Sequence, residues 1–304
     1  MLSTGNIMPW LQLTIPTTRA IAPRIEQILI NSDVLSITYE DNGDEAILEP
    51  ELGEHALWSM VNITGLFDVK VNTKLISNTL NQESQISETE HTWKLLEDKD
   101  WERESLKNYL PIKCSKRLWV CPSWIEPPEP DSINLLLDPG LAFGTGTHST
   151  TFLCLKWLDT LKLEGKTVID YGCGSGILAI ASLLLGAKNT TCIDIDPQAL
   201  IATLDNANRN GLLPHLTSVY LPENSPNNSA DILIANILAG PLISLASHLA
   251  TLTNPGGFIC LSGIMKDQAE EVRREFSTWF DFDPPVYRKE WVRLTAKKRS
   301  FIYL

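Results

Sequence analysis

The chain has 304 residues, of which 43% are hydrophobic and 20% are charged, and its formal net charge at pH 7 is −12. This length suits about two domains, and the composition excludes a collagen-like, low-complexity or disordered chain. The acidic balance argues against a protein whose whole surface binds nucleic acid. Residues 1–111 hold 18 acidic and 8 basic side chains, so the acidity lies in the N-terminal third and favours a basic partner.

Targeting signals and metal-binding patterns are not evident in the sequence. The first residues lack the basic and apolar segments of a secretory signal, and no apolar run reaches the roughly 18 residues of a membrane span. We therefore expect a cytoplasmic protein with no membrane contact. The six cysteines form no Cys-x-x-Cys pair, which indicates buried reduced thiols, and the five histidines lack metal-ligand spacing, so no metal is expected.

Residues 1–96 alternate between strand-like and helix-like patterns, which predicts a small α+β domain. The strands are expected at Trp10–Ile15, Val34–Tyr39, His55–Ile63 and Trp93–Leu96, and the helices at Ala20–Ile30 and Val69–Leu80. The polar stretch Asn78–Thr92 predicts a loop.

Residues 97–111 are charged and end at Leu110-Pro111, a pattern typical of an exposed helix that a proline terminates. We expect a linker helix there. It would separate an N-terminal domain of residues 1–96 from a C-terminal domain of residues 112–304.

Strands and helices alternate from Thr167 onward, which predicts a parallel sheet joined by crossover helices. The strands are expected at Thr167–Tyr171, Thr190–Asp194, Leu216–Leu221, Asp231–Asn236 and Phe258–Gly263. Asp196-Pro197 predicts a helix N-cap and first turn, and Asn254–Gly257 predicts a turn. Residues 285–304 alternate without an intervening helix, so we expect an antiparallel hairpin to close the sheet.

A glycine-rich turn, Gly172-Cys173-Gly174-Ser175-Gly176, follows the first of these strands. Its Gly-x-Gly-x-Gly spacing differs by one residue from the dinucleotide fingerprint, and Asp170 beside it would repel a pyrophosphate and favour a cation. The next strand ends at Asp194, where a carboxylate can accept hydrogen bonds from both hydroxyls of a ribose. These features disfavour a nicotinamide-dependent oxidoreductase and favour a cofactor without phosphate.

The segment Asp170–Gly176 and the residue Asp194 resemble the cofactor motifs of class I S-adenosylmethionine-dependent methyltransferases. Two further motifs, Leu137–Thr151 and Ala235–Pro241, resemble the ribosomal protein L11 methyltransferase family. The resemblance implies an α/β fold: a Rossmann-like class I methyltransferase domain preceded by a small α+β, ferredoxin-like substrate-recognition domain. It implies S-adenosylmethionine as cofactor, bound by Thr151, Gly172, Asp194 and Asn236.

Asn236 has a second expected role, because a side-chain amide oxygen can hold the N–H groups of an amine and aim its lone pair. Capping of the following helix is the alternative for Asn236, and a helix N-terminal position is the alternative for Thr151. His148 is the nearest candidate for a general base, although a structural or cofactor-adjacent position suits its glycine-rich and threonine-rich loop better.

The resemblance implies methylation of lysine side chains and the N-terminal α-amine of ribosomal protein L11, which the acidic domain would capture without direct contact to nucleic acid. One alternative is a methyltransferase of the same fold that acts on another protein or a small amine. Another is a noncatalytic binding module, which the intact Asp170, Asp194 and Asn236 disfavour.

Overall fold

The computed structural model describes residues 9–43, 57–82, 91–96, 109–138, 144, 146–225 and 228–300. The chain divides into two compact units, Met1–Ser105 and Leu106–Leu304. This division falls within the segment expected to form a linker helix. Residues 97–108 of that segment lie outside the described residues, and residues 109–111 form neither helix nor strand.

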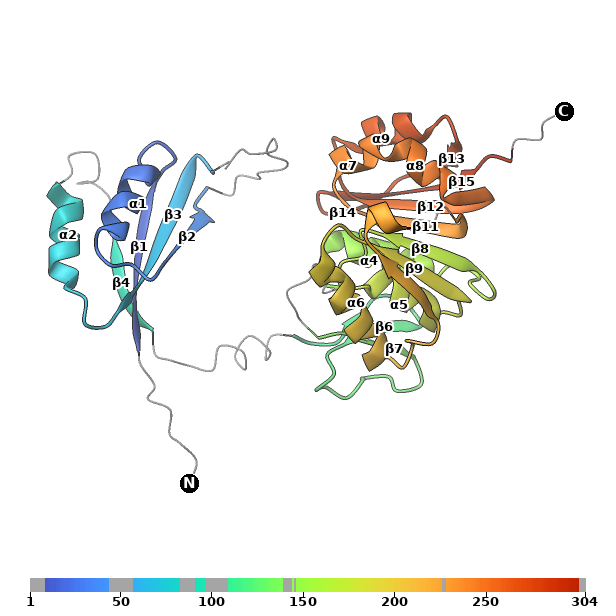
Figure 1. The fold of residues 1–304 in the computed structure, drawn as a ribbon, viewed down its shortest axis with the longest axis horizontal. Coiled ribbons are helices and arrows are strands. Elements are labelled where there is room, and N and C mark those ends of the chain that lie inside the picture. The colour runs from blue at the N-terminus through green and yellow to red at the C-terminus, as the bar shows by residue number, and fades with distance from the viewer. Residues whose placement is uncertain are drawn as a thin grey trace, which may run out of the picture. The chain divides into compact units, whose positions relative to one another are not determined.

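The described residues of the first unit form an antiparallel sheet with two helices (Figure 1). Its elements are β1 (Trp10–Thr18), α1 (Ala22–Ile30), β2 (Ser36–Asp41), β3 (Met60–Asp68), α2 (Thr73–Gln82) and β4 (Thr92–Leu96). The sheet order is β2-β3-β1-β4, and the element order is that of the split β-α-β motif. Leu13 and Ile15 alternate with more exposed residues along β1 and share a buried core with Ile25, Leu29 and Leu80 of the helices.

Two boundaries in this unit differ from the sequence prediction. The loop expected over Asn78–Thr92 is wrong at its start, because α2 continues to Gln82. Ile76 and Leu80 stand one helical turn apart and are both buried, which extends the helix through polar residues. Residues 83–90 lie outside the described part of the chain, as do the first two residues of the strand expected at His55–Ile63. That strand begins at Met60 and continues to Asp68.

The second unit contains an eight-stranded sheet, ordered β10-β9-β8-β11-β12-β15-β13, with β14 paired to β15 (Figure 1). Its parallel strands are β8 (Thr167–Tyr171), β9 (Asn189–Ile193), β10 (Leu216–Tyr220), β11 (Ala230–Asn236) and β12 (Thr253–Met265). The helices are α4 (Ser149–Leu158), α5 (Ile177–Leu184), α6 (Pro197–Arg209), α7 (Ala239–Ser244), α8 (Ala246–Thr251) and α9 (Ala269–Phe276), with a short 3-10 turn at Pro222–Asn224. The predicted parallel α/β sheet is confirmed.

The C-terminal part of the sheet is antiparallel, as predicted. The strands β14 (Val286–Arg288) and β15 (Trp291–Lys298) form a hairpin in which β15 pairs with β12, and an unexpected strand, β13 (Phe280–Phe282), also pairs with β15. The turn expected at Asn254–Gly257 lies inside β12 instead. The register against β11 shifts there, so these four residues form an irregular stretch of the strand.

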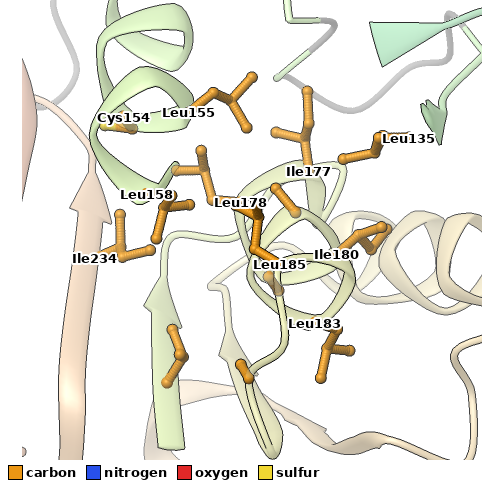
Figure 2. Close-up of a cluster of buried hydrophobic side chains, with 14 of the residues drawn as sticks. Leu135, Cys154, Leu155, Leu158, Ile177, Leu178, Ile180, Leu183, Leu185 and Ile234 are labelled. Carbon is orange, nitrogen blue, oxygen red and sulfur yellow. The ribbon is translucent and has the colours of Figure 1, made fainter. Parts of the chain in front are cut away.

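A small three-stranded sheet precedes the large one and was not predicted. It consists of β5 (Ile112–Lys113), β6 (Leu118–Cys121) and β7 (Ile133–Leu136). Leu135 of β7 belongs to the same buried cluster as Leu155 of α4 and Ile177 of α5 (Figure 2). This packing joins the small sheet to the helices that begin at the glycine-rich turn and at the His148 loop. All six cysteines are free and buried.

Within the described ranges, no helix is long and apolar enough to cross a membrane.

Candidate cofactor and catalytic site

A cavity of about 620 Å³ opens at the carboxyl ends of β8, β9 and β11 in the second unit. The chain reverses its strand order there, because β9 and β10 lie on one side of β8 and β11 lies on the other. Open α/β sheets bind ligands at such a switch point, and this volume is within the roughly 300–1,000 Å³ of small-molecule sites. The wall includes three of the four predicted cofactor residues, Gly172, Asp194 and Asn236.

The glycine-rich turn has a backbone that requires glycine. Gly172, Gly174 and Gly176 have φ values of +75°, +54° and +75°. L-residues rarely adopt this left-handed region. A Cβ atom at Gly172 would also collide with the side chain of Ile237, so the turn lies directly against the segment that follows β11.

Asp194 holds the glycine-rich turn and faces the cavity. Its Oδ2 accepts the backbone N–H of Gly174 at 2.8 Å, and its Oδ1 accepts that of Asp196 at 3.0 Å. A carboxylate has about four acceptor positions, so the described residues leave two for ligand hydroxyls. The N-cap of α6 is Asp196, as predicted, because its Oδ1 accepts the N–H of Gln198 at 2.9 Å.

Asp170 is a fully buried carboxyl group at the end of β8. Its Oδ2 accepts the N–H of Ala179 at 3.0 Å, whereas its Oδ1 has no hydrogen-bond partner among the described residues. Burial raises the pKa of Asp170 to about 7, against the opposing effect of the Ala179 hydrogen bond. This carboxyl group is therefore poised between its neutral and charged forms, and a nearby cation would favour the charged form.

Asn236 and Thr151 come together from β11 and α4. The Nδ2 of Asn236 donates to Thr151 Oγ1 at 3.4 Å, and Asn236 Oδ1 is buried without a partner among the described residues. Buried acceptors are normally paired, so this oxygen marks a place for a ligand N–H or O–H. Thr151 itself is fully buried and is not among the residues that line the cavity.

His148 has a structural role at the start of α4. It is the N-cap, with its Nδ1 accepting the N–H of Thr150 at 3.4 Å and lying 2.7 Å from Thr150 Oγ1. Its ring packs edge-on against Trp291 with centroids 4.8 Å apart, and burial lowers the pKa of His148. The capping bonds account for the position of His148, which also lines the cavity.

Sequence patterns missed several residues of the cavity wall, which come from separate elements: Pro222, Leu245, Gly263 and Trp291. No local motif marks them, because they converge only through packing of the sheet. Gly263 carried one usable signal, a glycine at a predicted strand end. Its φ is +84°, and a Cβ atom there would collide with the carbonyl group of Ile237.

No group of three or more histidine, cysteine, aspartate or glutamate side chains that could hold a metal ion occurs in the described part of the chain.

Comparison with known proteins gives a consistent result. The family model described as "Ribosomal protein L11 methyltransferase (PrmA)" matches residues 9–299. A protein named ribosomal protein L11 methyltransferase from Cellvibrio japonicus is 54% identical over 291 residues, which cover 96% of this chain and 99% of that protein. One of the same name from Teredinibacter turnerae is 50% identical over 293 residues, which cover 96% and 98%.

A solved structure also matches. It is a ribosomal protein L11 methylase from Lactobacillus delbrueckii subsp. bulgaricus, with a TM-score of 0.57 and 32% identity. The match covers 63% of this chain and all of that one.

Proposed function

Because the chain belongs to the ribosomal protein L11 methyltransferase family, we propose that it methylates lysine side chains and the N-terminal α-amine of ribosomal protein L11. It is an S-adenosylmethionine-dependent methyltransferase with a class I, Rossmann-like fold. One observation carries the proposed chemistry: Asn236 Oδ1 is a buried acceptor that has no hydrogen-bond partner among the described residues. Asn236 lines the same cavity as Asp194 and Gly172.

The cavity suits S-adenosylmethionine in size and in the groups it presents. We propose that the ribose hydroxyls of the cofactor donate to the two remaining acceptor positions of Asp194. We also propose that the cofactor packs against the backbone of Gly172, where the missing side chain allows a close approach. Thr151 supports the site through its hydrogen bond with Asn236. When bound, the cofactor supplies an activated methyl group on a sulfonium centre.

Asn236 is the proposed orienting residue for the acceptor amine. A methyl transfer to nitrogen needs a neutral amine with its lone pair in line with the methyl carbon and the departing sulfur, so alignment supplies much of the rate. Asn236 Oδ1 can accept an N–H of that amine and fix its direction. Leu238, Pro241 and Leu245 line the same cavity, and an apolar wall lowers the pKa of an entering lysine by desolvation.

Recognition of the protein substrate is assigned to the N-terminal unit. Residues 1–111 carry a net charge of −10, from 18 acidic and 8 basic residues, whereas residues 112–304 carry −2, from 19 and 17. An excess of acidic residues attracts a basic ribosomal protein and repels nucleic acid phosphates. A cytoplasmic location belongs to the same proposal, since the acceptor is a ribosomal protein.

The test is incubation of the full chain with methyl-labelled S-adenosylmethionine and unmethylated ribosomal proteins, followed by mass spectrometry of each labelled protein. We expect label on L11, at lysines and at the N-terminal amine. Label on a different protein or on a small amine, with none on L11, would overturn the assigned acceptor and leave the methyltransferase activity in place.

A further inference from the structure

One face of α6 holds the backbone of the glycine-rich turn. Thr203 and Asn206 stand three residues apart, so their side chains leave the same face of the helix. Thr203 Oγ1 donates to the carbonyl oxygen of Gly174 at 3.0 Å, and Asn206 Nδ2 donates to that of Ser175 at 2.9 Å. Both side chains are buried. Two consecutive carbonyl groups of the turn are therefore fixed by one helix.

The same face continues to Arg209, which fixes the amide of Asn206. Arg209 Nη1 donates to Asn206 Oδ1, and Arg209 Nε lies 3.3 Å from Asp138 Oδ2. A charged donor on Oδ1 determines which way the Asn206 amide points and keeps Nδ2 on Ser175. Asp138 in turn accepts the backbone N–H and the hydroxyl of Ser123, at 2.7 and 2.8 Å.

Ser175 extends this chain of contacts to Gly144. Its buried hydroxyl donates to the carbonyl oxygen of Gly144 at 2.7 Å. Gly144 has a φ of +104°, and a Cβ atom there would lie only 2.8 Å from Ser175 Oγ. Polar contacts therefore run without a break from Gly144 through Ser175, Asn206 and Arg209 to Asp138. None of these five residues is part of the cavity wall.

We infer that Asn206 and Arg209 are positioning residues for the cofactor, acting through the Ser175 backbone; this inference rests on the cofactor site proposed above. Three glycines in five residues give the turn little conformational preference of its own, and ordering it on binding costs free energy. The α6 contacts hold the turn in its binding form beforehand. Affinity for S-adenosylmethionine then depends on side chains that do not touch the cavity.

The decisive variant is Asn206→Asp, which changes a single atom from nitrogen to oxygen. It keeps the acceptor for Arg209 but sets a carboxylate oxygen against the Ser175 carbonyl oxygen, so the contact that holds the turn becomes repulsive. Asn208→Asp is the matched control, because it makes the same change on the same helix at an exposed position. Cofactor affinity is measured by calorimetry on the full chain, together with melting temperature and kcat at saturating cofactor.

We expect Asn206→Asp to raise the Kd for S-adenosylmethionine by about tenfold, the effect of one buried hydrogen bond, with kcat at saturation within about twofold of the unaltered chain. Asn208→Asp should leave the Kd unchanged. A purely structural role would lower the melting temperature while the folded protein kept its Kd, and that result would overturn the inference.

Arg209→Gln provides a second test if Asn206→Asp does not fold, because Arg209 is partly exposed and its loss frees the Asn206 amide to turn. A raised Kd for this variant supports the inference, and an unchanged Kd overturns it. Failure of the unaltered chain to bind S-adenosylmethionine is a separate outcome, which would overturn the proposed cofactor site and this inference with it.

Discussion

The amide Nδ2 of Asn236 donates a hydrogen bond to Thr151 Oγ1 over 3.4 Å, although 85 residues separate the two in the sequence. Because Thr151 takes the amide nitrogen, Asn236 Oδ1 is the atom left buried without a partner among the described residues. An amide rotated by half a turn would present a donor instead of an acceptor. In the arrangement with Thr151, Asn236 therefore presents an acceptor to the amine that it is proposed to orient.

Replacing Asn236 with alanine removes the acceptor and tests its proposed role in turnover. We expect kcat to fall by roughly 100-fold or more, the loss seen when one well-placed catalytic hydrogen bond is removed. The Kd for S-adenosylmethionine should rise by a smaller factor. Single-turnover kinetics and calorimetry separate the two effects, and an unaltered kcat would remove Asn236 from the mechanism.

Thr151→Val tests whether the threonine hydroxyl fixes the Asn236 amide. The variant keeps the side-chain shape but removes the acceptor for Nδ2, so we expect a loss of kcat of about tenfold, smaller than for Asn236→Ala. Thr151→Ser retains the hydroxyl and serves as the control with nearly full turnover. Equal activity of the valine and serine variants would show that the hydrogen bond is not needed.

Asp194→Asn tests the proposed ribose contact. The change removes the charge and replaces one acceptor with a donor, so we expect the Kd for S-adenosylmethionine to rise by at least about tenfold. Asp196→Asn is the matched control two residues away, because asparagine caps a helix as well as aspartate does. Calorimetry on both variants checks the result, and similar affinities for the two would place the ribose elsewhere.

The parallel strands were predictable because their environment is uniform. β8 runs from Thr167 to Tyr171, as the sequence predicted, since a strand buried on both faces reads as one apolar run between polar boundaries. The carboxyl ends of such strands carry the predicted site residues: Gly172 follows β8, Asp194 follows β9, and Asn236 is the last residue of β11. The topology of a parallel sheet therefore brings them to one edge of the sheet.

Other features depend on contacts that no local pattern encodes. Trp291 reaches the cavity from β15 because that strand pairs with β12 in an antiparallel register. The strands β6 and β7 are only four residues long, too short for a clear alternation, and are positioned by packing of residues such as Leu135. The hydrogen bond from Asn206 to Ser175 likewise joins residues that are 31 positions apart, and no sequence motif marks it.

Gly172→Ala tests the close approach between the glycine-rich turn and the segment after β11. The added Cβ atom would displace the side chain of Ile237, the neighbour of Asn236, and we expect loss of cofactor binding and activity. The larger substitution Gly172→Arg should abolish binding. Isothermal calorimetry and the methylation assay measure both effects.

Gly165→Ala separates this collision from backbone strain. Gly165 has a φ of +74°, almost the same as Gly172, yet no atom of the described residues lies within 4 Å of a Cβ atom added there. Both alanine variants should lose about 1 kcal/mol of stability from the left-handed backbone, measured by denaturant unfolding. Only Gly172→Ala should lose cofactor affinity, and equal losses in the two would mean that strain alone is responsible.

The buried carboxyl group of Asp170 should make the stability of the cofactor-free protein depend on pH. Its pKa is raised from an ordinary value of 3.8 to about 7, so the folded chain binds this proton more tightly than the unfolded chain. The resulting stabilisation is complete below pH 4 and is lost as the pH rises through 7, by an amount on the order of a few kcal/mol.

Asp170→Asn stays neutral throughout that range, and its amide oxygen can still accept the N–H of Ala179. The difference in melting temperature, taken as the value of the unaltered chain minus the value of this variant, should therefore fall steadily between pH 4 and pH 8. Asp267→Asn, a change at an exposed aspartate, should show a difference that does not vary with pH. A constant difference for Asp170→Asn would mean that Asp170 stays ionised in the folded protein, held by a donor to its Oδ1.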